Sequence, residues 1–257
     1  MKVEEFKIFR ENLKANVEKD VRVTGLVFLG SAADLSRVDE WSDHDFFLFV
    51  TPGAGEDFRQ DLTWLPNYSK ILLSPRETEH GLKVVYNDGH LLEFAVFDDE
   101  LELFGVNSFE VVLDRGGVQE RIEKAAERSQ SKPKNFDTEF EIFLAQILIG
   151  IGRARRGEVL SAGQFIRNFA PAKAMDLINE FCTPQSGSEG TLDNQNASRR
   201  FEARFPEIAR ELEAAQKLDL ENSGHTLLEI TTRSLSSRLN SKNLANISGI
   251  KKRLEWT

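Results

Sequence analysis

The chain has 257 residues, which is enough for one large or two medium-sized domains. It is 40% hydrophobic and 29% charged, as is typical of a soluble globular protein. The formal net charge is −9, and the acidic excess lies in the first 130 residues, whereas the remainder is slightly basic. An acidic first half argues against nucleic-acid binding, which needs a basic surface. Cys182 is the only cysteine, so an internal disulfide is excluded.

The sequence begins with a charged, amphipathic stretch, MKVEEFKIFRENLK, which does not resemble a signal peptide. The most apolar segment, Ile142 to Ile151, is too short to span a bilayer. We therefore expect a cytoplasmic protein that does not associate with a membrane.

The first two elements predicted in the chain are a helix over residues 2–19 and a strand over 22–30. The apolar run from Leu26 to Leu29 is short and bounded, as in a buried strand. Gly30 and Ser31 end this run. Glycine allows the backbone to approach a bulky ligand, while the serine hydroxyl and nearby N–H groups can bind phosphate oxygens.

A polar loop or short helix follows, and a second strand is predicted over residues 43–50. Asp43 and Asp45 lie two residues apart and therefore share one face of this strand, whereas His44 points to the other. Two such carboxylates repel each other unless a positive charge lies between them, and oxygen ligands suit Mg²⁺. The alternative is that Asp43 is a turn residue and Asp45 a solvated strand residue.

The rest of the first half completes a mixed sheet of five or six strands. We expect a helix at 54–65, a short strand at 71–73, a hairpin over 82–97 with its turn at Asn87-Asp88-Gly89, and a last strand at 109–115. Glu93 lies inside the second arm of the hairpin, between apolar residues. A charged residue there needs a partner or a function, unless it is an exposed edge residue.

The second half is predicted to be helical throughout. After a linker at 129–135, residues 140–151 are apolar nearly all round, which indicates a buried helix. One or two helices interrupted near Pro171, a polar loop at 184–198 and three further helical patterns follow. The predicted fold class is therefore α+β, with a mixed sheet and helices over residues 1–130 and an all-α helical bundle over 131–257.

The Gly-Ser step, the polar loop and the D-x-D that opens a hydrophobic strand resemble the signature of the polymerase-β-type nucleotidyltransferases. The resemblance implies that residues 1–130 are the catalytic domain. It also implies that Gly30 and Ser31 contact a nucleoside triphosphate and that Asp43 and Asp45 bind catalytic Mg²⁺. Glu93 would be the third acid, either as a metal ligand or as the general base, and we favour the base.

The helical half, with its apolar helix and the turn from Arg155 to Glu158, is similar to the lincosamide nucleotidyltransferases, and the kanamycin-type enzymes share this two-part plan. Among several basic residues of this half, Arg167 is the first choice for a contact with the nucleotide. The habit of such relatives also implies that a homodimer could form.

The function implied is transfer of a nucleoside monophosphate to a hydroxyl of a small antibiotic-like molecule. The donor would be ATP, which gives AMP, or another NTP, which gives its own monophosphate. Two alternatives are an enzyme that modifies a protein and a nucleotide-binding module without catalysis. Trp41, Phe46 and Trp64 could border an acceptor pocket, although we expect each to pack in the core. The histidines are expected to be structural or solvated.

Overall fold

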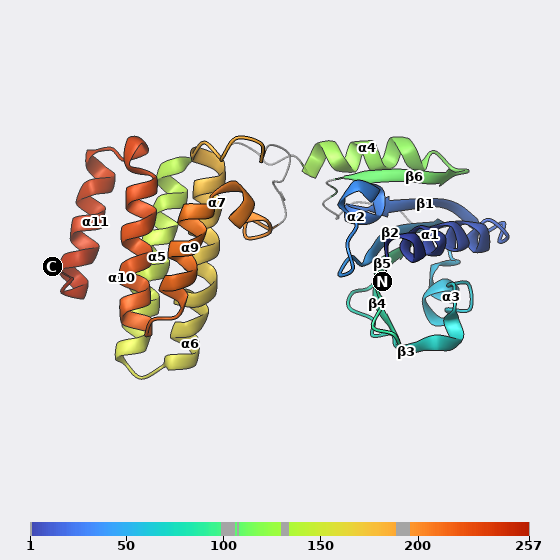
Figure 1. Cartoon of the computed structure of the whole chain (residues 1–257), viewed down its shortest axis with the longest axis horizontal. Coiled ribbons are helices and arrows are strands. Elements are labelled where there is room, and N and C mark those ends of the chain that lie inside the picture. Colours follow the sequence, from blue (N-terminus) through green and yellow to red (C-terminus); the bar gives the residue numbers. More distant parts are fainter. Residues whose placement is uncertain (1, 99–105, 107, 130–133, 189–195, 257) are drawn as a thin grey trace. The chain divides into compact units, whose positions relative to one another are not determined.

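A computed structural model describes residues 2–98, 106, 108–129, 134–188 and 196–256. The chain forms two compact units, Met1–Gln130 and Ser131–Thr257 (Figure 1). The first unit contains a mixed sheet with helices, and the described part of the second is helical. The predicted α+β fold class is thereby confirmed.

The sheet of the first unit is mixed because only one neighbouring pair of strands, β2 with β5, runs parallel. Its strand order is β3-β4-β5-β2-β1-β6, so β2 and β5 lie inside the sheet. The strands are β1 (Val23–Leu29), β2 (His44–Val50), β3 (Ile71–Leu73), β4 (Gly81–Tyr86), β5 (Leu91–Phe97) and β6 (Phe109–Asp114). These bounds agree with the predicted strands to within a residue or two.

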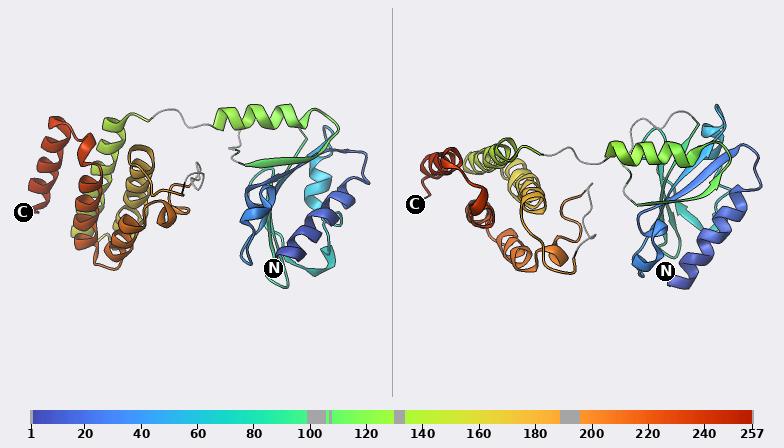
Figure 2. Two further views of the ribbon diagram at one scale, coloured as in Figure 1. Left: turned by 45° about the horizontal axis from the view of Figure 1, so that its top comes forward. Right: turned by 90° about the horizontal axis from the view of Figure 1, so that it is seen from above.

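Helices cover both faces of the sheet (Figure 2). On one face, α1 (Val3–Val17) and α3 (Gly55–Gln60) contribute to a core that includes Phe6 and Phe58. On the other face, α4 (Val118–Ser129) contributes Val118 and Ile122 to a second, smaller core. Strands β2 and β5 therefore contribute side chains to a core on each face of the sheet.

Two helices of the first unit differ from the prediction. The helix expected at 54–65 ends at Gln60, because Asp61 is extended and its carboxylate accepts a hydrogen bond from the Thr63 N–H, which forms a turn instead. Helix α4 was not predicted. The sequence does contain a capping residue for its start, because the Asp114 carboxylate accepts hydrogen bonds from the N–H groups of Val118 and Gln119.

The predicted hairpin is present, with Val85 opposite Leu91 and a turn at residues 87–89. Gly89 has φ of +85°, a conformation that glycine adopts without strain. The hydroxyl of Tyr86 donates a hydrogen bond to the carbonyl of Pro66 at 2.8 Å. This bond ties the hairpin to the loop after α3.

In the second unit, α5 is central and packs against α6, α7, α10 and α11. The prediction that residues 140–151 are buried all round was wrong in part, because Ile142 and Ile149 are exposed. The helices are α5 (Phe136–Arg155), α6 (Val159–Gln164), α7 (Ala170–Phe181), α8 (Phe201–Arg204), α9 (Pro206–Gln216), α10 (Leu220–Ser234) and α11 (Ser241–Leu254). The interruption predicted near Pro171 is a π-helical turn, Phe165–Phe169, that joins α6 to α7. Pro171 lies in the first turn of α7, directly after this π-helical turn.

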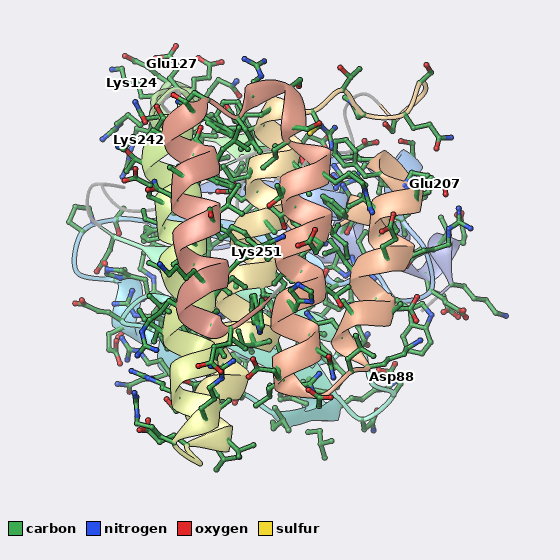
Figure 3. The ribbon with its side chains drawn as sticks, turned by 90° about the vertical axis from the view of Figure 1, so that its left-hand side faces the viewer. Asp88, Lys124, Glu127, Glu207, Lys242 and Lys251 are labelled. Carbon is green, nitrogen blue, oxygen red and sulfur yellow. The ribbon has the colours of Figure 1, made fainter. Side chains whose placement is uncertain are left out.

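Ion pairs between neighbouring helices complete the second unit. Lys242 and Lys251 both belong to α11 (Figure 3). Lys242 pairs with Glu141 of α5 at 2.8 Å, and Lys251 pairs with Glu229 of α10. Exposed pairs of this kind contribute little stability each, so the apolar core carries most of the packing energy.

Two predicted segments lie partly outside the described residues: the linker at 129–135 and the centre of the polar loop at 184–198. Within the described residues, no helix has both the length and the apolar character needed to cross a membrane.

Candidate active site

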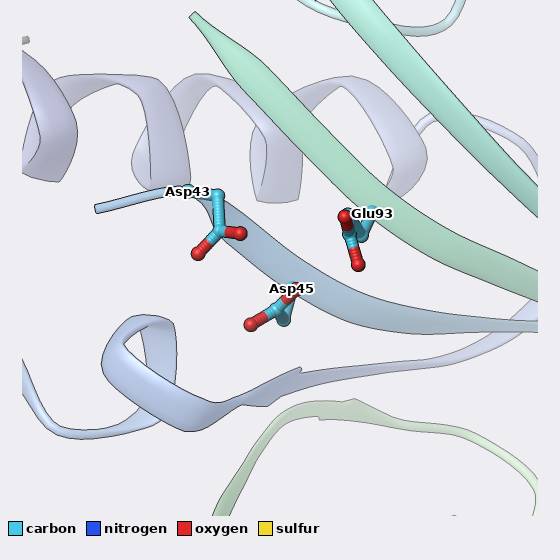
Figure 4. A group of neighbouring side chains, drawn as sticks. All are labelled: Asp43, Asp45 and Glu93. Carbon is cyan, nitrogen blue, oxygen red and sulfur yellow. The ribbon is translucent and has the colours of Figure 1, made fainter. Parts of the chain in front are cut away.

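Three carboxylates meet at one end of the paired strands β2 and β5. Asp43 directly precedes β2, Asp45 is its second residue, and Glu93 is the third residue of β5. Because the two strands are parallel and in register, Glu93 lies directly opposite Asp45. One oxygen from each of the three carboxylates lies within 4.8 Å of the others, and the side chains point into the same space (Figure 4).

The alternation of the strand sends His44, between the two aspartates, to the opposite face, where it is completely buried. Its Nε2 lies 3.1 Å from the carbonyl oxygen of Phe6, and its Nδ1 lies 2.7 Å from Nε2 of His90. Because the carbonyl can only accept, His44 Nε2 carries the hydrogen and His90 Nε2 donates to His44 Nδ1. The expectation that these two histidines are structural is confirmed.

Burial keeps both histidines neutral. It lowers the pKa of His44 to about 3, and the neighbouring His90 contributes in the same direction. Burial also lowers the pKa of His90 to about 4. The pair therefore anchors the start of β2 to α1 without adding charge beneath the carboxylates.

Gly30 forms the wall of the site on the side of β1. Its φ is +53°, a conformation that side chains other than glycine rarely adopt, and a Cβ at this position would lie 3.0 Å from Oδ2 of Asp45. The backbone at Gly30 is therefore in close contact with the carboxylate. Only glycine, which has no Cβ, allows the backbone to lie this close to Asp45 without displacing its carboxylate.

Hydrogen bonds hold the corner formed by Gly30 and Ser31 in place. The Gly30 N–H donates to the carbonyl of Ser108 at 3.2 Å, and the Ser108 hydroxyl donates back to the Gly30 carbonyl at 3.4 Å. The Ser31 hydroxyl donates a long bond, 3.5 Å, to the carbonyl of Asp43. The corner is thus tied both to the residue before β6 and to the start of β2.

Lys83 is a member of the site that the sequence reasoning missed. It lies opposite Glu93 in the β4–β5 pairing, and its ammonium contacts Glu93 at 3.2 Å and Glu77 at 3.1 Å. The hydrogen bonds that its ammonium donates to Glu77 and Glu93 raise the pKa of Lys83. The sequence could have predicted this contact, because strand pairing outward from the hairpin turn at 87–89 brings residue 83 opposite residue 93.

The donor set fits a hard divalent cation. Asp43, Asp45 and Glu93 offer carboxylate oxygens only, all three are half-buried, and they lie close enough for one ion to contact each. Mg²⁺ prefers oxygen ligands of this kind and usually keeps open positions for water or phosphate. The three residues could therefore hold Mg²⁺ together with a phosphate-bearing ligand.

Arg167 lies in the second unit and forms hydrogen bonds within that unit. Its guanidinium donates hydrogen bonds to the carbonyls of Gln216 and Leu218, which end α9 and begin the next loop. Arg155 and Lys173 also pair within this unit, with Glu221 and Glu139 respectively. A role for Arg167 in nucleotide binding stays a prediction.

The aromatic residues named from the sequence divide into two groups. Phe46 and Trp64 pack in the core, as expected. The expectation for Trp41 was wrong, because this side chain is 87% exposed. It borders a pocket of about 600 Å³ whose lining also includes Asp88, His90 and Ser42, the residue before Asp43.

Comparisons with known proteins provide matches only among solved structures. No protein-family model matches the sequence, and no curated protein matches it. The chain is similar to an aminoglycoside 6-adenyltransferase from Bacillus subtilis, with 13% identity, a TM-score of 0.43 and 95% of each chain covered.

Two further solved structures are similar to this chain. One is the CdnC:HORMA-deltaN complex of E. coli MS115-1, with 12% identity, a TM-score of 0.33 and 93% of each chain covered. The other is a STING-associated CdnE c-di-GMP synthase from Capnocytophaga granulosa, with 11% identity and a TM-score of 0.30, covering 98% of this chain and 80% of that one. Matches at this level do not assign an activity to this chain.

Proposed function

We propose that this chain is a Mg²⁺-dependent nucleotidyltransferase of the polymerase-β type that moves AMP from ATP to a hydroxyl group of a small molecule. One observation carries the proposal. The carboxylates of Asp43, Asp45 and Glu93 have oxygens within 4.8 Å of one another, beside the close-packed backbone of Gly30. Three acids so close together, each half-buried, are a natural site for a cation that also binds phosphate.

In this proposal, Asp43 and Asp45 hold the ion and thereby align the triphosphate. Gly30 and Ser31 form the adjoining surface for its phosphate oxygens, because the glycine leaves room there and the serine offers a hydroxyl. When bound, Mg²⁺ supplies charge neutralisation for the phosphates. Alignment and neutralisation are the main requirements of phosphoryl-type transfer.

In the proposed reaction, Glu93 accepts the proton of the acceptor hydroxyl. The acceptor oxygen forms a bond to the α-phosphorus, the bond from that phosphorus to the bridging oxygen of the β-phosphate breaks, and pyrophosphate leaves. The hydroxyl proton passes to the Glu93 carboxylate. Lys83 contacts one oxygen of this carboxylate at 3.2 Å.

The charge of the first unit favours a small acceptor over a nucleic acid, because an acidic excess does not suit a nucleic-acid acceptor.

The test is release of pyrophosphate by the purified full chain with ATP, Mg²⁺ and a panel of hydroxylated small molecules, including aminoglycosides and lincosamides. We expect at least one acceptor to give release that stops on addition of a chelator and is missing in Asp45→Asn. Labelling of proteins in a lysate with no small acceptor used would favour the protein-modifying alternative. Magnesium-dependent ATP binding without turnover on any acceptor would favour the non-catalytic module.

A further inference from the structure

The pocket of about 600 Å³ that Trp41 borders lies beside the first residues of β2 and β5. Three segments of the first unit supply its lining: the start of α1, the loop before β2, and the hairpin turn with the first residue of β5. Small-molecule sites usually have volumes of roughly 300–1,000 Å³, so the pocket is large enough for a small ligand. Neither the three carboxylates nor the proposed reaction uses it.

The pocket lies on the face of the sheet that α1 covers. His90 lines it, and His90 contacts His44, on which the ring of Phe6 from α1 stacks with the ring centroids 3.6 Å apart. Asp45 and Glu93 point away from the opposite face, because side chains alternate along a strand. The pocket and the three carboxylates are therefore two separate places at the same end of the sheet.

His90 provides the pocket with a hydrogen-bond acceptor. Its side chain lines the pocket, although the residue is only 7% exposed. Its Nε2 donates to Nδ1 of His44, so the neutral ring of His90 has no hydrogen on Nδ1. This Nδ1 makes no hydrogen bond among the described residues. An N–H group of a ligand would complete a chain of hydrogen bonds that all run in one direction, through both histidines to the Phe6 carbonyl.

The charges around the pocket favour a cation. Its lining carries the ammonium of Lys2 and the carboxylates of three residues, Glu5, Glu40 and Asp88. The positive end of the α1 dipole adds only about half a charge, so the carboxylates outweigh it and Lys2 together. Glu5 and Asp88 accept hydrogen bonds from the backbone N–H groups of Lys2 and His90, at 3.1 and 3.0 Å, and neither forms an ion pair among the described residues. Their charges remain available to a ligand.

Trp41 gives the pocket an aromatic wall. Its side chain is 87% exposed, and its backbone N–H donates a hydrogen bond to the Asp39 carboxylate at 2.8 Å, which holds the turn that presents the ring. A cation above an indole ring is attracted by the negative face of the ring, and an alkyl chain gains apolar contact there. Trp41 therefore suits a ligand that combines positive charge with a carbon chain.

We propose that this pocket binds a small organic polyamine, with its ammonium groups on Glu5, Asp88 and Nδ1 of His90 and its carbon chain on Trp41. The inference goes beyond the proposed nucleotidyltransferase function and does not depend on it. The carboxylates and the bare imidazole nitrogen all accept hydrogen bonds, which disfavours an anion and favours a ligand with several N–H donors.

Calorimetric binding of spermidine to the full chain tests this inference. Spermidine is a linear polyamine without a hydroxyl group, so it cannot serve as the acceptor in the proposed reaction. We expect saturable binding of spermidine and no binding of citrate, an anion. Spermidine should also protect tryptophan fluorescence from quenching by acrylamide, because it covers Trp41, and Trp41→Ala should abolish this protection and weaken binding by roughly two- to thirtyfold.

Two substitutions remove charge from the pocket but keep an oxygen for the backbone N–H that each carboxylate accepts. Glu5→Gln and Asp88→Asn should each weaken spermidine binding by roughly two- to fivefold, and the double variant by about tenfold. The matched control is Asp61→Asn, because Asp61 accepts the Thr63 N–H at 3.0 Å in a similar turn but does not line this pocket. Asp61→Asn should bind spermidine like the wild type, and so should Asp45→Asn, whose change lies on the opposite face.

The outcomes separate the two proposals, because spermidine binding is measured without ATP. If the wild type shows no saturable binding of spermidine, or binds citrate as well, the inference about the pocket is wrong. Equal weakening in Asp61→Asn and Asp88→Asn would also overturn it, because spermidine would then be attracted to the acidic chain as a whole. The proposed function fails or stands separately, on the release of pyrophosphate.

Discussion

Glu93 lies directly opposite Asp45 because β2 and β5 are parallel neighbours in register. Lys83 lies opposite Glu93 on the next strand, β4. Two acidic residues and a lysine therefore lie side by side on three adjacent strands, on one face of the sheet. A register shift of one residue in the β2–β5 pairing would put Glu93 and Asp45 on opposite faces, and the same shift in the β4–β5 pairing would separate Lys83 from Glu93. The site therefore depends on strand pairing as much as on the residues themselves.

Asp45→Asn should remove turnover while leaving the fold intact. We expect a loss of at least a hundredfold, because even residues that only orient a metal ligand typically contribute ten- to a hundredfold. The stability should stay within about 1 kcal/mol of the wild type or rise, because one of three mutually repelling charges is removed. Pyrophosphate release and urea unfolding measure the two effects, and full activity would refute the metal assignment.

Glu93→Gln separates the two roles considered for this residue. As the general base, Glu93 should contribute roughly a hundred- to ten-thousandfold to turnover. We expect a loss in this range with little change in the Mg²⁺ concentration that gives half-maximal activity. A titration of activity against Mg²⁺ provides the check, and a large increase in the half-maximal concentration would instead identify Glu93 as a metal ligand.

Gly30→Ala should impair activity more than its effect on stability explains. Alanine in this left-handed conformation costs about 1–2 kcal/mol, and its Cβ would lie 3.0 Å from the Asp45 carboxylate. Gly53→Ala is the control, because φ is +83° there but no atom lies within 4 Å of the added carbon. Both variants should lose similar stability in urea unfolding, whereas activity should fall only in Gly30→Ala.

The buried pair of His44 and His90 should make the first unit sensitive to acid. The pKa of His44 is about 3 in the folded state and about 6.5 when unfolded, so the unfolded chain binds the additional proton between these values. The stability contributed by the neutral histidine is present above pH 6.5 and is lost as the pH falls toward 3, by about 2 kcal/mol for His44 at pH 5.

Urea unfolding between pH 7.5 and 4.5 measures this dependence. His44→Leu should be less stable at neutral pH, because it loses the hydrogen bond to the Phe6 carbonyl, but its stability should vary less with pH. His225 is more exposed and lies on α10 of the other unit, so His225→Gln should keep the wild-type dependence. A pH dependence as large in His44→Leu as in the wild type would contradict the assignment, because His90 alone accounts for only part of it.

Replacement by alanine should have opposite effects on stability at two glycines of the second unit. A Cβ at Gly150 of α5 would lie 2.6 Å from Cδ1 of Ile166, so Gly150→Ala should overpack the core and destabilise by about 1–3 kcal/mol. A Cβ at Gly249 of α11 meets nothing within 4 Å, so Gly249→Ala should stabilise by about 0.5–1 kcal/mol through helix propensity. Thermal or urea unfolding measures both changes in stability.

Local sequence patterns were sufficient for most elements of this protein. Period-two alternation and the Asn87-Asp88-Gly89 turn predicted β2 and the hairpin, because side-chain direction in a strand and turn chemistry are short-range properties. The start of α4 was missed although its Asp114 cap is local, and Trp41 was misplaced because burial of one aromatic residue depends on distant segments.

The sequence by itself determined that Asp43 and Asp45 share a face and that His44 points away, since two residues on one strand have no other choice. Only the tertiary structure decided that Glu93 joins them and that Lys83 lies beyond it. The physical reason is that these neighbours come from separate segments, and their proximity follows from strand order and register, which no short stretch of sequence specifies.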